Sequence, residues 1–241
     1  MNANGTARLQ SVVDEYVAEA AEKGLYDHTG RCLRTERWGG TVVLMLVDAA
    51  FTSVGLDYFN TVVPAVLDFE ASLYDPGTVS TLEGLADVRP ETVEDVWANR
   101  RSWRVARGVA DHLATVADRE GVDDREALRR WAADVDLERW DEGPVGAVSG
   151  VGINTVQYLR MMGGVDTAMP DSIVRRVIER LLAEADVDLP TDGDVELVRT
   201  IGDIAAATDH RPIEVCWTTW LVESEGDLVA DERYRDALDR I

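Results

Sequence analysis

The sequence predicts an all-α protein. Apolar residues recur at the three- and four-residue spacing of one helix face, as Leu9, Val13 and Tyr16 do near the start of the chain. Between such segments stand turn-forming groups such as Asp75-Pro76-Gly77 and Gly163-Gly164. The sequence contains no alternating apolar and polar run between tight turns of the kind that indicates a β-hairpin.

The expected helices follow one another along the chain. They cover residues 9–20, 42–50, 58–67, 103–117, 128–135, 153–162, 173–185, 195–207 and 213–222. The segment 42–50 is apolar on every side except at Asp48, which predicts a central and mostly buried helix. Asp48 itself is either a second functional carboxylate or a structural acid. We expect the chain ends and the middle of the chain to form two lobes.

Length and composition predict a cytoplasmic protein. The chain has 241 residues and no apolar stretch near the roughly 20 residues that span a bilayer. Its first residues lack the basic and apolar regions of a secretory signal. Two distant cysteines, Cys32 and Cys216, are too few for a disulfide framework, a structural zinc site or an iron–sulfur cluster. We therefore expect no metal, no cofactor and no membrane contact.

The net charge is strongly negative. The chain carries 46 acidic against 24 basic residues, a formal charge of -22, and Lys23 is its only lysine. Such acidity is typical of proteins that do not bind nucleic acid, but it is also typical of proteins adapted to high salt. We favour the second interpretation, because the acids are spread along the chain and do not form a tail.

The most informative segment is Gly150-Val151-Gly152, which stands directly before an expected helix. Glycine lets the backbone approach an anion closely, and a helix N-terminus presents free N–H groups to it. A phosphodiester fits such a site without any base being read, and Thr155 could add a hydroxyl. Taken alone, the same pattern also describes an ordinary tight turn.

Together with the residues that follow it, this segment resembles the helix-hairpin-helix DNA glycosylase superfamily, which includes endonuclease III-like, MutY-like and 8-oxoguanine glycosylases. Members of that family have a Gly-Val-Gly hairpin, a helix, a turn of small residues and then an aspartate that begins another helix. This chain carries the last part of the pattern as Asp171, Val174, Arg176 and Val177. The resemblance extends, more weakly, over residues 35 to 225.

The resemblance implies a two-lobed helical fold with a cleft between the lobes. The implied glycosylase domain covers residues 35–225, preceded by a helical extension at 1–34 and followed by a tail at 226–241. It also implies a monomer that binds double-stranded DNA by sequence-independent backbone contacts. The implied activity is base-excision repair, in which a damaged or mismatched base is flipped into the cleft and its N-glycosidic bond is hydrolysed. Asp171 would stabilise the positive charge that grows on the sugar, although an aspartate in this position is also an ordinary helix N-cap.

Three positions depart from the family pattern. Asn154 stands where lyase-type members carry the lysine that forms a Schiff base with the sugar, so we expect a monofunctional glycosylase without lyase activity. Ile173 replaces a histidine, and Ala50 stands where a glutamine fills the gap left by the flipped base. These departures favour an alternative, a non-catalytic helix-hairpin-helix DNA-binding protein, whereas Asp171 favours the enzyme. A third alternative is an acidic interaction protein that does not bind DNA.

Local charge predicts where DNA would lie. Residues 97–110 contain four arginines and no acidic residue. Arginines neutralise phosphates, although an arginine-rich helix face can also be merely solvated or paired with acids. The residues that we predict to bind DNA are Gly150, Val151, Gly152, Asn154, Thr155, Arg104, Arg107, Arg175 and Arg176.

Overall fold

Helices are the only regular elements in the part of the chain that the computed structural model describes, which is residues 3–223, 237 and 239–241. The all-α prediction is therefore confirmed for these residues. None of the described helices is long and apolar enough to span a bilayer. Most of the predicted tail at 226–241, namely residues 226–236 and 238, lies outside the described residues.

The elements follow in order along the chain. The first are α1 (Ala3–Ala21), α2 (Leu25–Leu33), η1 (Arg37–Gly40), α3 (Val42–Thr52), η2 (Tyr58–Val62), α4 (Val63–Phe69) and η3 (Glu70–Tyr74). After them come α5 (Leu82–Asp87), α6 (Pro90–Val93), α7 (Arg100–Glu120), α8 (Asp124–Asp134), η4 (Leu137–Arg139) and α9 (Ile153–Met162). The last are α10 (Ser172–Ala185), α11 (Asp194–Ala207) and α12 (Pro212–Glu223).

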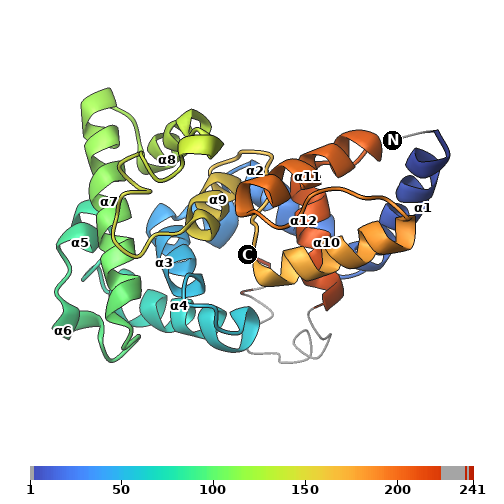
Figure 1. Ribbon diagram of the computed structural model, residues 1–241. Helices are drawn as coiled ribbons and strands as arrows, with labels where there is room; N and C mark the ends of the chain where they lie inside the picture. Colours follow the sequence, from blue (N-terminus) through green and yellow to red (C-terminus); the bar gives the residue numbers. More distant parts are fainter. Residues whose placement is uncertain (1–2, 224–236, 238) are drawn as a thin grey trace.

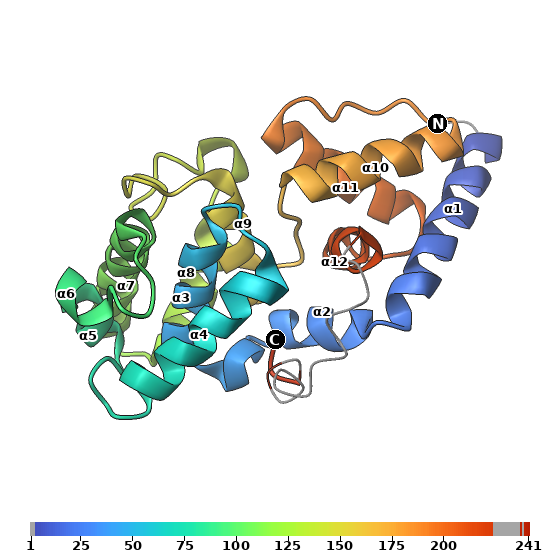
Figure 2. The same cartoon turned by 90° about the horizontal axis from the view of Figure 1, so that it is seen from below.

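The helices lie in two groups. Helices α3 to α9 make up one group, and α1, α10, α11 and α12 make up the other (Figures 1 and 2). The second group thus combines the start of the chain with its last helices, because α1 packs against α10, α11 and α12. Helix α2 contacts both groups, through α9 on one side and α12 on the other.

Helix α3 is the centre of the first group. Every residue from Val42 to Phe51 is buried, and the helix contacts α4, α5, α7, α8 and α9. This central position follows from its sequence, because a helix that is apolar on all sides has no polar face to expose to water. The long helix α7 covers it with one apolar stripe that includes Val105, Val109 and Leu113.

Local signals fix the ends of the helices around the hairpin. The Asn99 side chain accepts hydrogen bonds from the backbone N–H groups of Arg101 and Ser102 and so begins α7. Gly121, with a φ of 64°, ends the same helix in the left-handed conformation that favours glycine. Asp123 caps α8 by accepting from Glu126 N at 2.8 Å.

The segment expected as one α-helix at 58–67 differs in the structure. It begins as the π-helical turn η2, in which Val62 N donates to Asp57 O at 3.2 Å, and becomes α-helical only at Val63. A second π-helical turn, η3, follows α4. Such turns insert an extra residue into the helical ladder and occur often at functional sites.

Candidate functional site

The hairpin before α9 has the backbone that its glycines predict. Gly150 has a φ of 104°, a conformation that other residues rarely adopt. Val151 N donates to Val148 O at 2.9 Å and closes the turn, and Gly152 then begins α9 as its N-cap. The preceding segment, 140–149, forms turns and no helix, so no helix stands directly before the hairpin.

The start of α9 offers free N–H groups to a ligand. Val156 N is the first to find a helical partner, Gly152 O at 3.1 Å, whereas the N–H groups of residues 152–155 donate to no acceptor among the described residues. A Cβ added at Gly152 would meet no atom within 4 Å. The backbone is therefore open here to an anion of phosphate size. Thr155 is buried, so its hydroxyl is not part of this open surface.

The hairpin rests on the first turns of α7. Arg101 donates to Gly150 O through Nε and Nη2, at 3.3 and 3.0 Å, and Arg104 Nη1 lies 3.4 Å from Ser149 Oγ. The side chain of Val148 packs directly against Gly108, where a Cβ atom would lie only 2.6 Å from a methyl group of that valine. The arginine-rich end of α7 and the predicted phosphate site thus form one continuous surface.

The other predicted DNA-binding arginines have protein partners. Arg107 Nε donates to Ala86 O at 2.8 Å and joins α7 to α5. Arg175 pairs with Asp194 at 2.6 Å, and Arg176 pairs with Glu223 at 2.8 Å. The carboxylates of Asp194 and Glu223 oppose the positive charge of Arg175 and Arg176, whereas the hydrogen bonds of Arg107 and Arg104 go to uncharged groups.

Asp171 is the N-cap of α10. Its Oδ1 accepts a hydrogen bond from Val174 N at 2.8 Å, and the side chain is half-buried. Burial raises the pKa of this carboxyl above its usual range, and the backbone N–H groups of Val174 and Ile173 only partly oppose that shift. The indole of Trp220 also lies close enough to lower the pKa slightly, although its Nε1 completes no hydrogen bond.

Asp171 stands where the chain passes from the first group of helices to the second. The segment between α9 and α10 crosses from one group to the other in Figure 2. Across this boundary, the ring of Trp220 on α12 contacts that of Tyr58 on η2, with centroids 5.7 Å apart. A carboxylate at this place can act on a group held between the two sets of helices.

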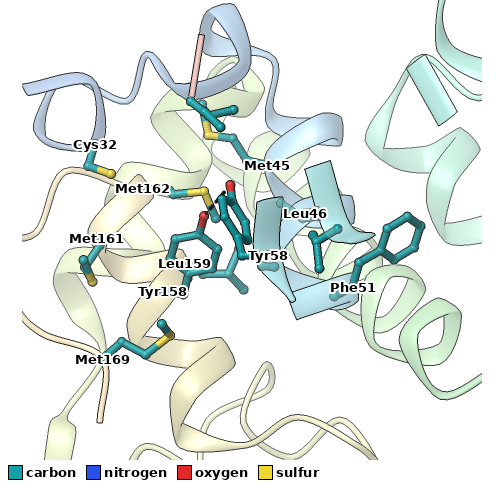
Figure 3. Packing of buried hydrophobic residues seen from close by; sticks show 14 of the residues in the cluster. Cys32, Met45, Leu46, Phe51, Tyr58, Tyr158, Leu159, Met161, Met162 and Met169 are labelled. Atoms are coloured by element: carbon teal, nitrogen blue, oxygen red, sulfur yellow. Dashed lines mark hydrogen bonds between the residues drawn. The ribbon is translucent and has the colours of Figure 1, made fainter. Parts of the chain in front are cut away.

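A buried polar cluster lies further inside the same boundary. Asp48 Oδ2 accepts from Trp38 Nε1 at 2.7 Å and from the hydroxyls of Tyr58 and Tyr158, both at 3.1 Å. Arg37 Nη2 lies 3.3 Å from the same oxygen, and both charged side chains are fully buried. Figure 3 shows the two tyrosine rings side by side. Asp48 is thus a structural acid with a buried partner, one of the two interpretations that its sequence allows.

Two positions in this region bear on the family pattern. Ala50 is completely buried in α3, so it cannot fill the gap left by a flipped base. Lys23 donates to Glu19 Oε1 at 2.9 Å and to Leu221 O at 2.8 Å, after the end of α1 and away from the hairpin. The sequence signals missed Trp220 and the Arg37–Asp48 pair, although a charged residue inside an apolar helix is itself a sign that a buried partner exists.

Comparison with known protein families, curated proteins and solved structures finds no match to this chain.

Proposed function

We propose that this chain binds the backbone of double-stranded DNA through its hairpin and hydrolyses the N-glycosidic bond of a damaged or mismatched base. The observation that carries the proposal is Asp171, a half-buried carboxylate at the boundary of the two helix groups, held by the first turn of α10. The open N–H groups at the start of α9 and the arginines of α7 supply a place for phosphates. The same proposal has the chain acting as a cytoplasmic monomer.

The chemistry needs an ionised carboxylate beside the sugar. As the glycosidic bond breaks, positive charge develops on the sugar ring, and a fixed negative charge nearby stabilises that state. Val174 N orients Asp171 in advance, so no reorganisation is needed when the charge appears. Water then completes the hydrolysis. The only lysine is held by Glu19 and the backbone of α12, so the proposal includes no Schiff base and no lyase step.

The test is base release from duplexes that each carry one deaminated, oxidised, alkylated or mismatched base, in high salt. We expect the parent to excise one of these four classes of base. Asp171→Asn should lower the rate of that excision on the order of 100-fold or more. Asparagine still caps a helix, so stability should change by at most about 1 kcal/mol. Asp123→Asn is a matched control, because Asp123 also caps a helix with a 2.8 Å bond. Equal excision by the parent and Asp171→Asn would remove Asp171 from the mechanism.

One observation favours a second candidate, a DNA-binding protein without excision activity. A cavity near Asp171, lined by Met169 and Trp220 among others, has a volume of about 10 Å³, whereas pockets for small ligands commonly measure about 300 Å³ or more. DNA binding by the parent without release of any base from the panel would establish this alternative. No DNA binding at all, at any salt concentration, would contradict both candidates.

A further inference from the structure

The small cavity near Asp171 lies between α9, the segment that precedes α10, and α12. It is lined by Tyr158, Met161, Met169, Cys216, Trp217 and Trp220. Its volume of about 10 Å³ is room for a single water molecule. Figure 3 shows Tyr158, Met161 and Met169 on one side of the buried cluster. In this structure the cavity is therefore closed to any larger ligand.

Trp220 is the most exposed of the residues that line this cavity. The other five lining residues are at most 4% exposed, whereas Trp220 is half-buried. Its indole also lies next to Asp171. Removal of this one ring would join the cavity to the space in front of the candidate catalytic carboxylate.

Ring contacts hold Trp220 in place, and no hydrogen bond fixes it. The ring packs against Tyr58 and Trp217, with centroid distances of 5.7 and 6.1 Å. Its Nε1 is buried and has no hydrogen-bond partner among the described residues. A buried N–H without an acceptor disfavours the closed position. Rotation of the ring outward would let this group reach an acceptor.

The residue opposite Trp220 belongs to an irregular helix. Tyr58 lies in the π-helical turn η2, whose Val62 N bonds to Asp57 O and not to the residue four positions before it. The Tyr58 hydroxyl is anchored to Asp48, and its buried ring meets that of Trp220 at an interplanar angle of 67°. Aromatic faces stack on nucleobases irrespective of sequence.

We propose that Trp220 is a gate, which swings outward so that a planar heterocycle takes its place against Tyr58 and Trp217, next to Asp171. This inference rests on the proposed function, in which the heterocycle is the flipped base. It goes beyond that function by predicting two states of one site. In one state Trp220 fills the site, and in the other the heterocycle occupies it. It also explains how a cavity of about 10 Å³ stands beside a candidate catalytic carboxylate.

The first test uses no DNA. Trp220→Ala should bind indole, because a cavity lined by apolar side chains accepts an apolar ligand of matching shape. We expect millimolar indole to raise the thermal midpoint of Trp220→Ala, and not that of the parent or of Trp140→Ala. Trp140 is the matched control, a half-buried tryptophan that lines an open groove elsewhere. Folded Trp220→Ala that binds no indole, or indole binding by Trp140→Ala as well, would overturn the gate.

The second test covers the case in which Trp220→Ala does not fold. The parent is labelled with 5-fluorotryptophan, and Trp220→Phe assigns the Trp220 resonance. A duplex with an abasic site analogue should shift or split that resonance; an unmoved resonance with DNA bound would refute the gate. If DNA does not bind, the proposed function fails, and indole binding by Trp220→Val, a smaller truncation of the same side chain, then decides whether the pocket exists.

Discussion

Replacement of Asp48 by alanine should be among the most destabilising single changes in this chain. The carboxylate is fully buried and lies 3.3 Å from the equally buried guanidinium of Arg37. Two other nitrogens of that guanidinium, Nε and Nη1, complete no hydrogen bond to nitrogen or oxygen in the described part of the chain. Without Asp48 the positive charge would stay buried with no counter-ion, while Trp38 Nε1 would lose its acceptor.

The expected loss follows from these contacts. Removal of one partner of a buried ion pair costs about 3–5 kcal/mol, because the other charge is left uncompensated. For a chain of this size, a loss of that magnitude lowers the thermal midpoint by roughly 6–20 °C. Urea unfolding followed by circular dichroism, at one fixed salt concentration, measures the free energy directly.

Two further variants test whether Arg37 and Asp48 behave as a buried ion pair. Glu19→Ala removes an exposed ion pair with Lys23, at 2.9 Å, and should cost less than about 1 kcal/mol. Arg37→Met combined with Asp48→Leu removes both buried charges and should be more stable than Asp48→Ala alone. The interpretation as a buried charge pair would be wrong if Asp48→Ala lost no more free energy of unfolding than Glu19→Ala. It would also be wrong if the double variant were less stable than Asp48→Ala.

Three other predictions concern the carboxylate, the net charge and the hairpin. Because burial raises the pKa of Asp171, excision should fall with acid at a higher pH than the ordinary aspartate value of about 3.9. Because the folded-state pKa of Asp171 is raised, its protonated form stabilises the folded state, and this stabilisation is lost as pH rises. Asp171→Asn should therefore be at least as stable as the parent at pH 7. Near pH 3 it should show no gain in stability. The chain has a net charge of -22, so added salt should stabilise it by screening the repulsion between acidic residues. The thermal midpoint should rise between 0.1 and 1 M KCl, over which the screening length falls from about 10 to 3 Å. A midpoint that falls over this range would contradict the prediction. Gly152→Val should cost about 1 kcal/mol at most, since valine is a poorer N-cap than glycine, and should weaken DNA binding. Gly146→Ala should be more destabilising, because its Cβ would overlap Trp140 O. Unaltered DNA affinity in Gly152→Val would exclude the hairpin as the phosphate site.

Elements with a strong local signal were predictable from the sequence. Helix α9 begins and ends at the expected residues, because Gly152 and Gly163 flank an uninterrupted helical segment. Helix α10 begins one residue before the expected start, directly after its capping Asp171. Helix α3 was expected at 42–50 and extends to Thr52, and its burial follows from its composition. In each case the information lies within the segment itself.

Elements fixed by distant contacts were not predictable. Helix α2, Leu25–Leu33, contains Gly30 near its middle, and it is held between α9 and α12. The partners of Asp48 come from η1, η2 and α9, and no spacing in the sequence relates them. Trp220 meets Asp171 only because α12 packs on α10. Pairings of this kind are decided by the tertiary structure.

The acidity of the chain and the proposed DNA-binding surface are compatible because the ion pairs are unevenly distributed. Arg175, Arg176 and Arg180 each lie within ion-pair distance of a carboxylate, so the region after the hairpin has little positive charge to offer. Arg101 and Arg104, at the start of α7, have no carboxylate partner among the described residues and contact the hairpin through a carbonyl and a hydroxyl. The salt that screens long-range repulsion between acids and phosphates also weakens arginine–phosphate contacts. Under the proposed function, a chain of this charge would depend on contacts that salt affects least. Backbone N–H groups at a helix N-terminus are of that kind, since they bring a phosphate close without a mobile charge.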